Sequence, residues 1–138
     1  MKAILIIILL FWSFRLLAPG IMEFTIPKIE PLRPYEKLWQ SICKIESNND
    51  SLAFCIDING KPSIGIAQIQ ESRLNDYNKR TGNNYQLMDC FSPVISKKIF
   101  MYYCQGDYET TARKWNGGNN GMKIESTIKY FDRIKLAL

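Results

Sequence analysis

An uninterrupted apolar run at the amino end restricts where a globular domain can begin in this chain. Lys2 precedes the run, Ala3 to Phe14 carry no charge, and Arg15 is followed by small and apolar residues. A short positive start before an apolar stretch is typical of an export signal. The run is shorter than the roughly 20 residues that a membrane-spanning helix needs. We therefore expect residues 1–20 to be a signal peptide or an uncleaved membrane anchor, and the absence of a clear cleavage site leaves both alternatives open.

Prolines mark the boundary of the folded domain. Pro27 and Pro31 interrupt residues 21–33, which show no helical period and are expected to form an extended linker. Pro34 suits the first turn of a helix, where the missing N–H does no harm. The remaining residues, 34–138, are enough for one domain that buries its own core.

Apolar spacing predicts that this domain is mainly helical. Helices are expected from Pro34 to Ser47, from about Gln68 to Arg80, from Pro93 to before Gly106, from Asp107 to about Trp115, and from about Ser126 onward. The third should place Ile95, Ile99 and Tyr102 on one face. The last should bury a stripe of Ile124, Ile128, Phe131, Ile134 and Leu138.

One segment has the two-residue periodicity of a β-strand. Phe54, Ile56 and Ile58 alternate with polar or small residues before Asn59-Gly60, which predicts a short strand and a tight turn. The expected class is therefore α+β, mainly helical, in a single domain with a small irregular or β segment.

The net charge excludes few classes of binding partner. Lys and Arg number 18 against 13 Asp and Glu, which gives a net charge of +5. A basic excess suits a polyanionic partner such as cell wall, nucleic acid or an anionic membrane surface, and it serves solubility equally well. Basic residues are scattered between acids and form no block of six, so nucleic acid is not expected.

Cysteines and the lack of histidine restrict the chemistry. Cys43, Cys55, Cys90 and Cys104 make an even count in a chain that looks exported, so disulfides are expected, with three possible pairings. Buried free thiols are the alternative. No Cys-Xaa-Xaa-Cys pair occurs and the chain has no histidine, so a zinc site is not expected. The same absence excludes Ser–His and Cys–His nucleophiles.

One carboxyl group suits acid catalysis on a sugar bond. Glu46 follows Ile42 by four residues, so it borders the apolar face of its predicted helix. It also lies in the last turn, where the negative end of the helix dipole disfavours a carboxylate. Both effects raise the pKa of Glu46, as a general acid requires. An ordinary surface glutamate near a helix end is the competing interpretation.

The residues that follow Glu46 resemble a known series in order. Glu46-Ser47, Gly65-Ile66-Ala67-Gln68, Trp115-Asn116-Gly117-Gly118 and Tyr130-Phe131 resemble the Glu-Ser, Gly-Leu-Met-Gln, Tyr-Asn-Ala-Gly and Tyr-Val motifs of the lysozyme-like lytic transglycosylases. The resemblance spans Glu46 to about Ile134, and it implies a lysozyme-like fold. Two positions depart from the motifs. Ala67 replaces methionine in the groove wall, and Trp115 replaces tyrosine while keeping an aromatic platform.

The resemblance implies a role for each matching residue. Glu46 would be the general acid and then the base, and the hydroxyl of Tyr130 would contact its carboxyl group. The sugar-binding groove would be formed by Ser47, Ser63, Gly65, Gln68, Asn116 and Tyr130. The amide of Asn116 suits the acetamido group of a sugar, because it offers both a donor and an acceptor. No metal or organic cofactor is implied.

The activity implied is that of a peptidoglycan lytic transglycosylase. Glu46 would cleave the β-1,4 bond between N-acetylmuramic acid (MurNAc) and N-acetylglucosamine (GlcNAc), leaving 1,6-anhydroMurNAc. Glycosidases usually pair two carboxylates, and Asp50, Asp57, Glu71 and Asp76 are candidates for a second by proximity alone. Two alternatives stay open: a hydrolytic lysozyme on the same fold, and a catalytically silent glycan-binding module.

Small exported members of the family suggest a setting for this activity. The expected partners are peptidoglycan strands and a secretion, conjugation or pilus machine. The protein would act as a monomer in the periplasm or cell envelope, touching a membrane only through its amino-terminal segment.

Overall fold

The structure is a computed structural model that describes residues 34–138. The signal or anchor expected over residues 1–20 and the linker expected over 21–33 lie outside the described residues. The elements in chain order are α2 (Glu36–Ser47), β1 (Phe54–Ile56), β2 (Pro62–Ile64), β3 (Ile69–Gln70), α3 (Glu71–Thr81), the 3₁₀ helix η2 (Leu87–Phe91), α4 (Pro93–Tyr103), α5 (Tyr108–Gly117), the 3₁₀ helix η3 (Gly118–Lys123) and α6 (Ser126–Lys135).

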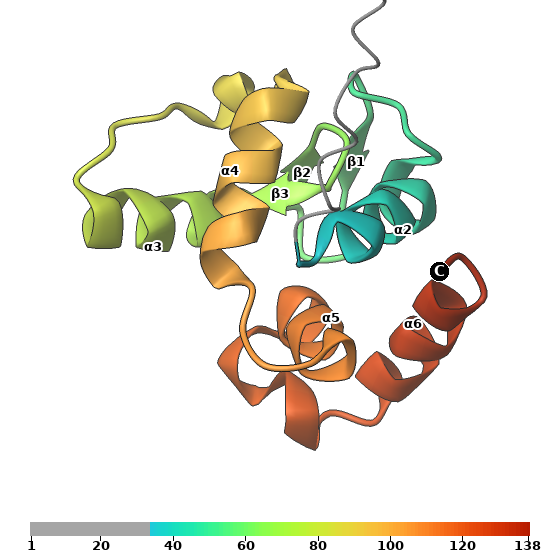
Figure 1. Ribbon diagram of the computed structural model, residues 1–138. Helices are drawn as coiled ribbons and strands as arrows, with labels where there is room; N and C mark the ends of the chain where they lie inside the picture. Colours follow the sequence, from blue (N-terminus) through green and yellow to red (C-terminus); the bar gives the residue numbers. More distant parts are fainter. Residues whose placement is uncertain (1–33) are drawn as a thin grey trace, which may run out of the picture. The chain divides into compact units, whose positions relative to one another are not determined.

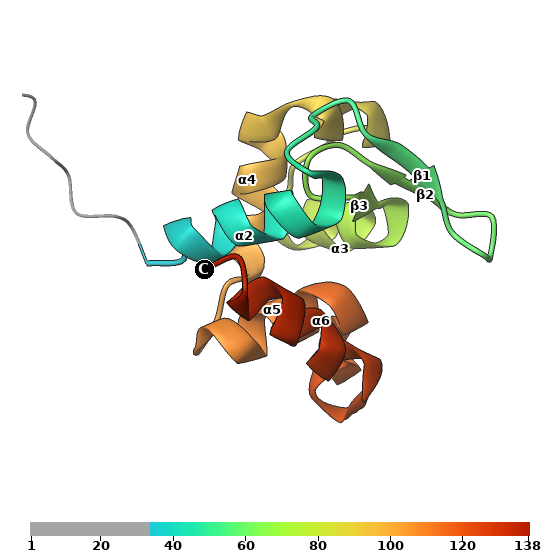
Figure 2. The ribbon, with the colours of Figure 1, turned by 90° about the vertical axis from the view of Figure 1, so that its right-hand side faces the viewer.

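One small antiparallel sheet lies beside α2, α3 and α4, and α5 and α6 lie apart from it, so the expected α+β, mainly helical class is confirmed (Figure 1). The strand order is β1-β2-β3. Cys55 pairs with Ser63, and Ile64 pairs with Ile69. The alternating segment therefore forms the predicted strand, and its hairpin projects away from the helices (Figure 2).

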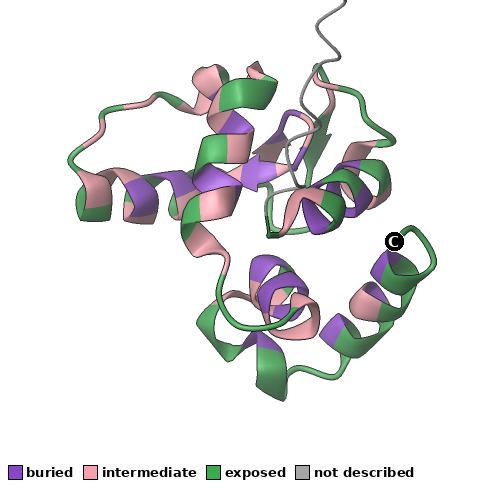
Figure 3. Cartoon of the chain, viewed as in Figure 1, coloured by how far each residue is buried: buried purple, intermediate pink, exposed green. Residues whose placement is uncertain are grey.

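The core is built around α4. Phe100 on this helix is fully buried. Its ring lies 5.3 Å from the ring of Trp39 on α2 and 5.2 Å from that of Trp115 on α5, measured between centroids. Buried residues line the faces that α3, α4 and the sheet turn toward one another (Figure 3). Aromatic contacts of this kind fix the spacing of the helices that carry the cleft described below.

Several helix ends follow from local chemistry as predicted. Asp107 caps α5, because its Oδ1 accepts a 2.7 Å hydrogen bond from the backbone N–H of Thr110. Asn48 ends α2 in the left-handed conformation at φ 55°, and Gly82 ends α3 at φ 73°. The helix expected from about Gln68 begins only at Glu71, because Ile69 and Gln70 pair with β2 as a third strand.

Two predicted apolar faces are wrong in detail. Tyr102 is 44 % exposed, and α4 instead buries Ser96, Ile99 and Phe100. On α6, Ile128 is also 44 % exposed, and the buried residues are Thr127, Tyr130 and Ile134. Polar side chains occupy these inward positions because each finds a hydrogen-bond partner: Ser96 donates to the carbonyl of Cys90, and Thr127 donates to that of Gly121.

The disulfide prediction is not supported. Cys43, Cys55, Cys90 and Cys104 all lie in the described part of the chain, and all four are free thiols. Burial raises the pKa of Cys43 and Cys104 to about 12 and that of Cys90 to about 11. Cys43 and Cys90 are therefore small apolar core residues, the alternative left open by the sequence, and Cys104 is partly buried against the core. Across residues 34–138, none of the helices has the length and apolar character needed to cross a membrane.

Candidate active site

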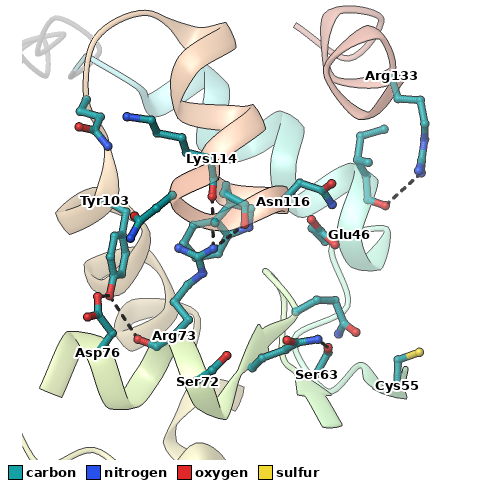
Figure 4. Close-up of a pocket in the computed structure, with 17 residues that line it drawn as sticks. Glu46, Cys55, Ser63, Ser72, Arg73, Asp76, Tyr103, Lys114, Asn116 and Arg133 are labelled. Atoms are coloured by element: carbon teal, nitrogen blue, oxygen red, sulfur yellow. Dashed lines mark hydrogen bonds between the residues drawn. The ribbon is translucent and has the colours of Figure 1, made fainter. Parts of the chain in front are cut away.

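A cleft of about 630 Å³ gathers residues from most of the elements. Its walls come from the end of α2, the sheet, α3, the end of α4, the carboxyl end of α5 and α6 (Figure 4). Of the predicted catalytic and sugar-binding residues, Glu46, Ser63, Gln68 and Asn116 line it, as do Trp115 and Asp76, one of the candidates for a second carboxylate. Ser47, Gly65 and Tyr130 do not belong to the lining.

Glu46 is the acid of this cleft. It is the penultimate residue of α2 and is half-buried. Burial, the dominant effect, raises the pKa of Glu46, while the hydrogen bond from Tyr130 and the charges of Arg133 and Arg73 oppose the rise. The net direction favours a carboxyl group that keeps its proton further toward neutral pH than a free glutamate does.

Tyr130 contacts Glu46 from α6, the last helix in the described sequence. Its phenol donates a 2.6 Å hydrogen bond to Oε1 of Glu46, joining α6 to α2. Tyr130 is only 6 % exposed, and burial raises its pKa well above the ordinary value, so the phenol stays protonated and remains a donor. The contact fixes one oxygen of the carboxyl group and leaves the other free to act.

The turn after β2 is held by its own backbone and by α2. Gly65 has φ +76°, and a Cβ atom there would lie 2.1 Å from the carbonyl oxygen of Cys90. Ser47 donates a 2.8 Å hydrogen bond to the carbonyl of Ile66, tying the end of α2 to this turn. Nε2 of Gln68 donates to the carbonyl of Gly65 at 3.0 Å. Ser47 and Gly65 thus shape the wall, while Gln68 also faces the cleft.

A polar chain runs along the sheet side of the cleft. Nε2 of Gln70 donates to Oγ of Ser63 at 3.3 Å and to Oδ2 of Asp57 at 3.4 Å. Oδ1 of Asp57 accepts the backbone N–H groups of Asn59 and Lys61. These backbone hydrogen bonds, led by the one from Lys61, lower the pKa of Asp57, so its carboxylate is ionised.

Trp115 lines the cleft but exposes too little of its ring to form the aromatic platform expected from the sequence. Its side chain is only 6 % exposed and packs edge-on against Phe100. The neighbouring Asn116 is exposed at the cleft, and within residues 34–138 its side chain makes no hydrogen bond. The amide is therefore free to meet a ligand.

Arg73 occupies the place beside the Trp115 ring, and the sequence analysis missed it. Its guanidinium carbon lies 4.4 Å from the centroid of Trp115 and 5.0 Å from that of Tyr103. Nη2 donates to the carbonyl of Trp115 at 2.6 Å. One signal was available: Arg73 precedes the buried Tyr77 by four residues, which places a charge on the inward face of α3.

Asp76 is the other carboxylate in the lining. Nε of Arg80 donates to both of its oxygens, and the phenol of Tyr103 donates to Oδ2 at 2.7 Å. These hydrogen bonds, led by that from Arg80, lower the pKa of Asp76. Its charge is therefore already matched inside the protein. The described part of the chain holds no group of three His, Cys, Asp or Glu side chains placed to bind a metal ion.

Comparison with known proteins gives structural likeness only. No family model matches the sequence, and no curated protein sequence matches it. Among solved structures, the chain is similar to Meretrix lusoria lysozyme in complex with Aeromonas hydrophila PliI, with 27 % identity and a TM-score of 0.62. Tapes japonica lysozyme gives 26 % identity and a TM-score of 0.62. Each match covers 72 % of this chain and 86 % of the other.

An inhibitor-bound lysozyme from Meretrix lusoria is similar to the same degree, with 27 % identity and a TM-score of 0.61. The lysozyme-like fold implied by the sequence resemblance is therefore confirmed, and the similar structures are of glycan-cleaving enzymes. Membership of the lytic transglycosylase family is not confirmed.

Proposed function

We propose that this protein cleaves the glycan strands of peptidoglycan, with Glu46 as general acid. The observation that carries the proposal is the 2.6 Å hydrogen bond from Tyr130 to a half-buried Glu46 in the wall of a long cleft. Breaking a glycosidic bond needs a proton on the leaving oxygen, and a carboxyl group with a raised pKa supplies it. The lysozyme-like fold supports the same class of reaction.

The hydrogen bond also decides which oxygen acts. Because Tyr130 donates to Oε1, the proton of the neutral acid resides on Oε2. Oε2 then protonates the bridging oxygen of the glycan, and the resulting carboxylate accepts a proton from the attacking nucleophile. The Tyr130 hydrogen bond stabilises that carboxylate, so one contact serves both halves of the reaction.

The proposed reaction is hydrolysis, in which water is the nucleophile that attacks the bond between MurNAc and GlcNAc. The similar structures are lysozymes, and a second carboxylate of suitable character, that of Asp57, accepts a hydrogen bond from a side chain of the cleft wall. Asp57 is ionised and touches the lining residue Gln70, while the pKa of Glu46 is raised. Two carboxyl groups whose pKa values move in opposite directions are the usual division of labour in glycosidases. In this scheme Asp57 stabilises positive charge on the sugar.

Lytic transglycosylation is the second candidate, with the 6-hydroxyl of MurNAc as nucleophile. The Glu46–Tyr130 contact favours it, because the sequence resemblance implied that same pairing. Substrate-assisted chemistry would need no second carboxylate. In both schemes Ser63, Gln68 and Asn116 hold the sugars, while Ser47, Gly65 and Tyr130 position the wall and the acid. The proposal also includes export to the cell envelope and action as a monomer. It further includes a role in opening the wall for a secretion, conjugation or pilus machine.

The deciding experiment is mass spectrometry of purified peptidoglycan digested by residues 21–138. Hydrated reducing ends establish hydrolysis, and 1,6-anhydroMurNAc ends establish transglycosylation. Both should vanish in Glu46→Gln and persist in Glu125→Gln, a matched change at an exposed glutamate whose side chain makes no hydrogen bond within residues 34–138. If the wild type yields no fragments but sediments with the wall, the protein is a glycan-binding module and the enzymatic proposal fails.

A further inference from the structure

The guanidinium of Arg73 is held more firmly than a surface arginine, and the proposed cleavage reaction does not use it. Nη2 donates to the carbonyls of Trp115 and Lys114, at 2.6 and 3.4 Å. Both carbonyls belong to the last turn of α5, where no intrahelical donor remains. The planar group also packs against the rings of Tyr103 and Trp115, 5.0 and 4.4 Å from their centroids. Arg73 therefore has a fixed orientation before any ligand arrives.

The other donors of this group are unused. Within residues 34–138, Nε and Nη1 of Arg73 have no hydrogen-bond partner. Every fully buried side-chain nitrogen or oxygen in that part of the chain does have one. Nε and Nη1 are therefore open to the cleft that Arg73 lines (Figure 4). Each offers an N–H group that can donate a charge-assisted hydrogen bond to a carboxylate oxygen.

The charged side chains around Arg73 carry an excess of positive charge, which favours binding of an anion. Arg73, Lys114 and Arg133 all line the cleft. Of the two carboxyl groups in the lining, Asp76 is matched by Arg80 and Tyr103. The other, Glu46, carries a proton when the enzyme is ready to act as an acid. The wall is thus positive at the moment that substrate binds.

We propose that Arg73 forms a carboxylate-binding subsite, which takes an acidic group carried by the glycan. This inference rests on the proposed function and narrows its substrate to anionic strands. Two sources carry that chemistry: the lactyl carboxylate of MurNAc in strands stripped of peptide, and a carboxylate of the stem peptide where the lactyl group is amide-linked. A neutral chitin oligomer carries neither. Arginine suits this task better than lysine, because its planar guanidinium can bind the backbone carbonyls through Nη2 and still present further donors in fixed directions to a ligand.

A binding experiment tests the subsite without requiring cleavage. Calorimetry on the Glu46→Gln protein compares a peptide-free GlcNAc–MurNAc tetrasaccharide with its lactyl methyl ester, and adds the peptide-bearing tetrasaccharide. The free acid should bind about tenfold more tightly than the ester, which is the effect of one charge-assisted contact. A preference for the peptide-bearing strand over both would assign the stem peptide as the source.

Two variants separate binding from structure. Arg73→Lys keeps the charge but loses the fixed donors Nε and Nη1, so it should abolish most of the preference for the acid while leaving the affinity for the ester unchanged. Arg133→Lys, a matched change at another cation of the lining, should keep the preference. The wild-type comparison of acid with ester needs no variant at Arg73 and stands even if Arg73→Lys unfolds.

The outcomes are distinct. Equal affinity for the acid, the ester and the peptide-bearing strand overturns the subsite, and so does a preference that Arg133→Lys removes and Arg73→Lys keeps. Failure of the digestion experiment with an intact acid preference removes the enzymatic proposal and leaves the subsite standing.

Discussion

Tyr130 and Glu46 form a 2.6 Å hydrogen bond that links residues 84 positions apart in the chain. It joins the last helix described to the first, and it places a donor on the carboxyl group that is best suited to acid catalysis. The bond favours the carboxylate, which in the proposed reaction is the form that appears after the proton has been given to the substrate.

Removing this hydroxyl should change the pH profile as well as the rate. Tyr130→Phe deletes a contact that lowers the pKa of Glu46, so that pKa should rise further. We expect kcat to fall about tenfold, as for the loss of a charge-assisted hydrogen bond. The decline of activity at high pH should move to higher pH. Turnover of a soluble glycan measured from pH 4 to 9 checks both, and an unmoved alkaline limb would contradict the assignment.

Replacing the acid should cost activity and add stability. Glu46→Gln should lower kcat about 10²–10⁴-fold. Because the folded state raises the pKa of Glu46, folding favours the protonated form, and stability is lost as pH rises from the ordinary glutamate pKa through the folded one. Glutamine escapes that loss, so it should stabilise the domain by about 1 kcal/mol at pH 7. Thermal melts should show the gain at pH 7 and not at pH 4; a gain that is independent of pH would refute this explanation.

A second carboxylate distinguishes the two proposed outcomes. Asp57→Asn keeps an oxygen that can accept the backbone N–H groups of Asn59 and Lys61 but removes the charge. For a hydrolase we expect kcat to fall about 10²-fold. Asp76→Asn is the matched control and should change kcat much less, because Arg80 already neutralises Asp76. Full activity of Asp57→Asn would favour the substrate-assisted scheme.

Two glycines with the same φ angle should differ in how much a substitution by alanine destabilises the fold. Gly60 and Gly65 both have φ +76°, but only at Gly65 would a Cβ atom meet another group, the carbonyl of Cys90 at 2.1 Å. Gly60→Ala should cost about 1 kcal/mol of unfolding free energy for the backbone alone. Gly65→Ala should cost about 1–3 kcal/mol more, because the turn must move. Urea unfolding of both variants measures the difference, and equal costs would show that the turn adapts freely.

Thiol labelling tests the state of the cysteines. Burial raises the pKa of Cys43, Cys90 and Cys104 to about 11 or 12 and shields them, whereas Cys55 is exposed. A thiol reagent at pH 7 should therefore modify one cysteine in the native protein and four after denaturation without reductant. Fewer than four in the denatured protein would reveal a disulfide.

Local chemistry made much of the fold predictable. Asp107, Asn48 and Gly82 mark helix ends through effects confined to a few residues, and the hairpin follows from alternation next to Asn59-Gly60. The buried face of α6 was mispredicted, because apolar spacing alone cannot foresee that Thr127 finds buried partners or that Tyr130 is drawn inward by Glu46. Those pairings depend on tertiary contacts.

The candidate site also contains residues that could be predicted from the sequence and residues that could not. Glu46 could be singled out from its place at the end of an amphipathic helix, but Arg73 could not be assigned a role from its neighbours in sequence. Its partners are the rings of Tyr103 and Trp115, which come from two other helices. The same arrangement explains why Trp115 is no sugar platform, since the guanidinium lies beside its ring.

The position of Tyr130 has a consequence for the order of events during synthesis. The acid is made early, on α2, whereas its hydrogen-bond donor is made only when α6 has been added. A nascent chain that stops short of α6 therefore carries an unsupported carboxyl group and lacks one wall of its cleft. If the protein cleaves peptidoglycan as proposed, that activity would be absent from the unfinished chain and would appear only when α6 docks against α2.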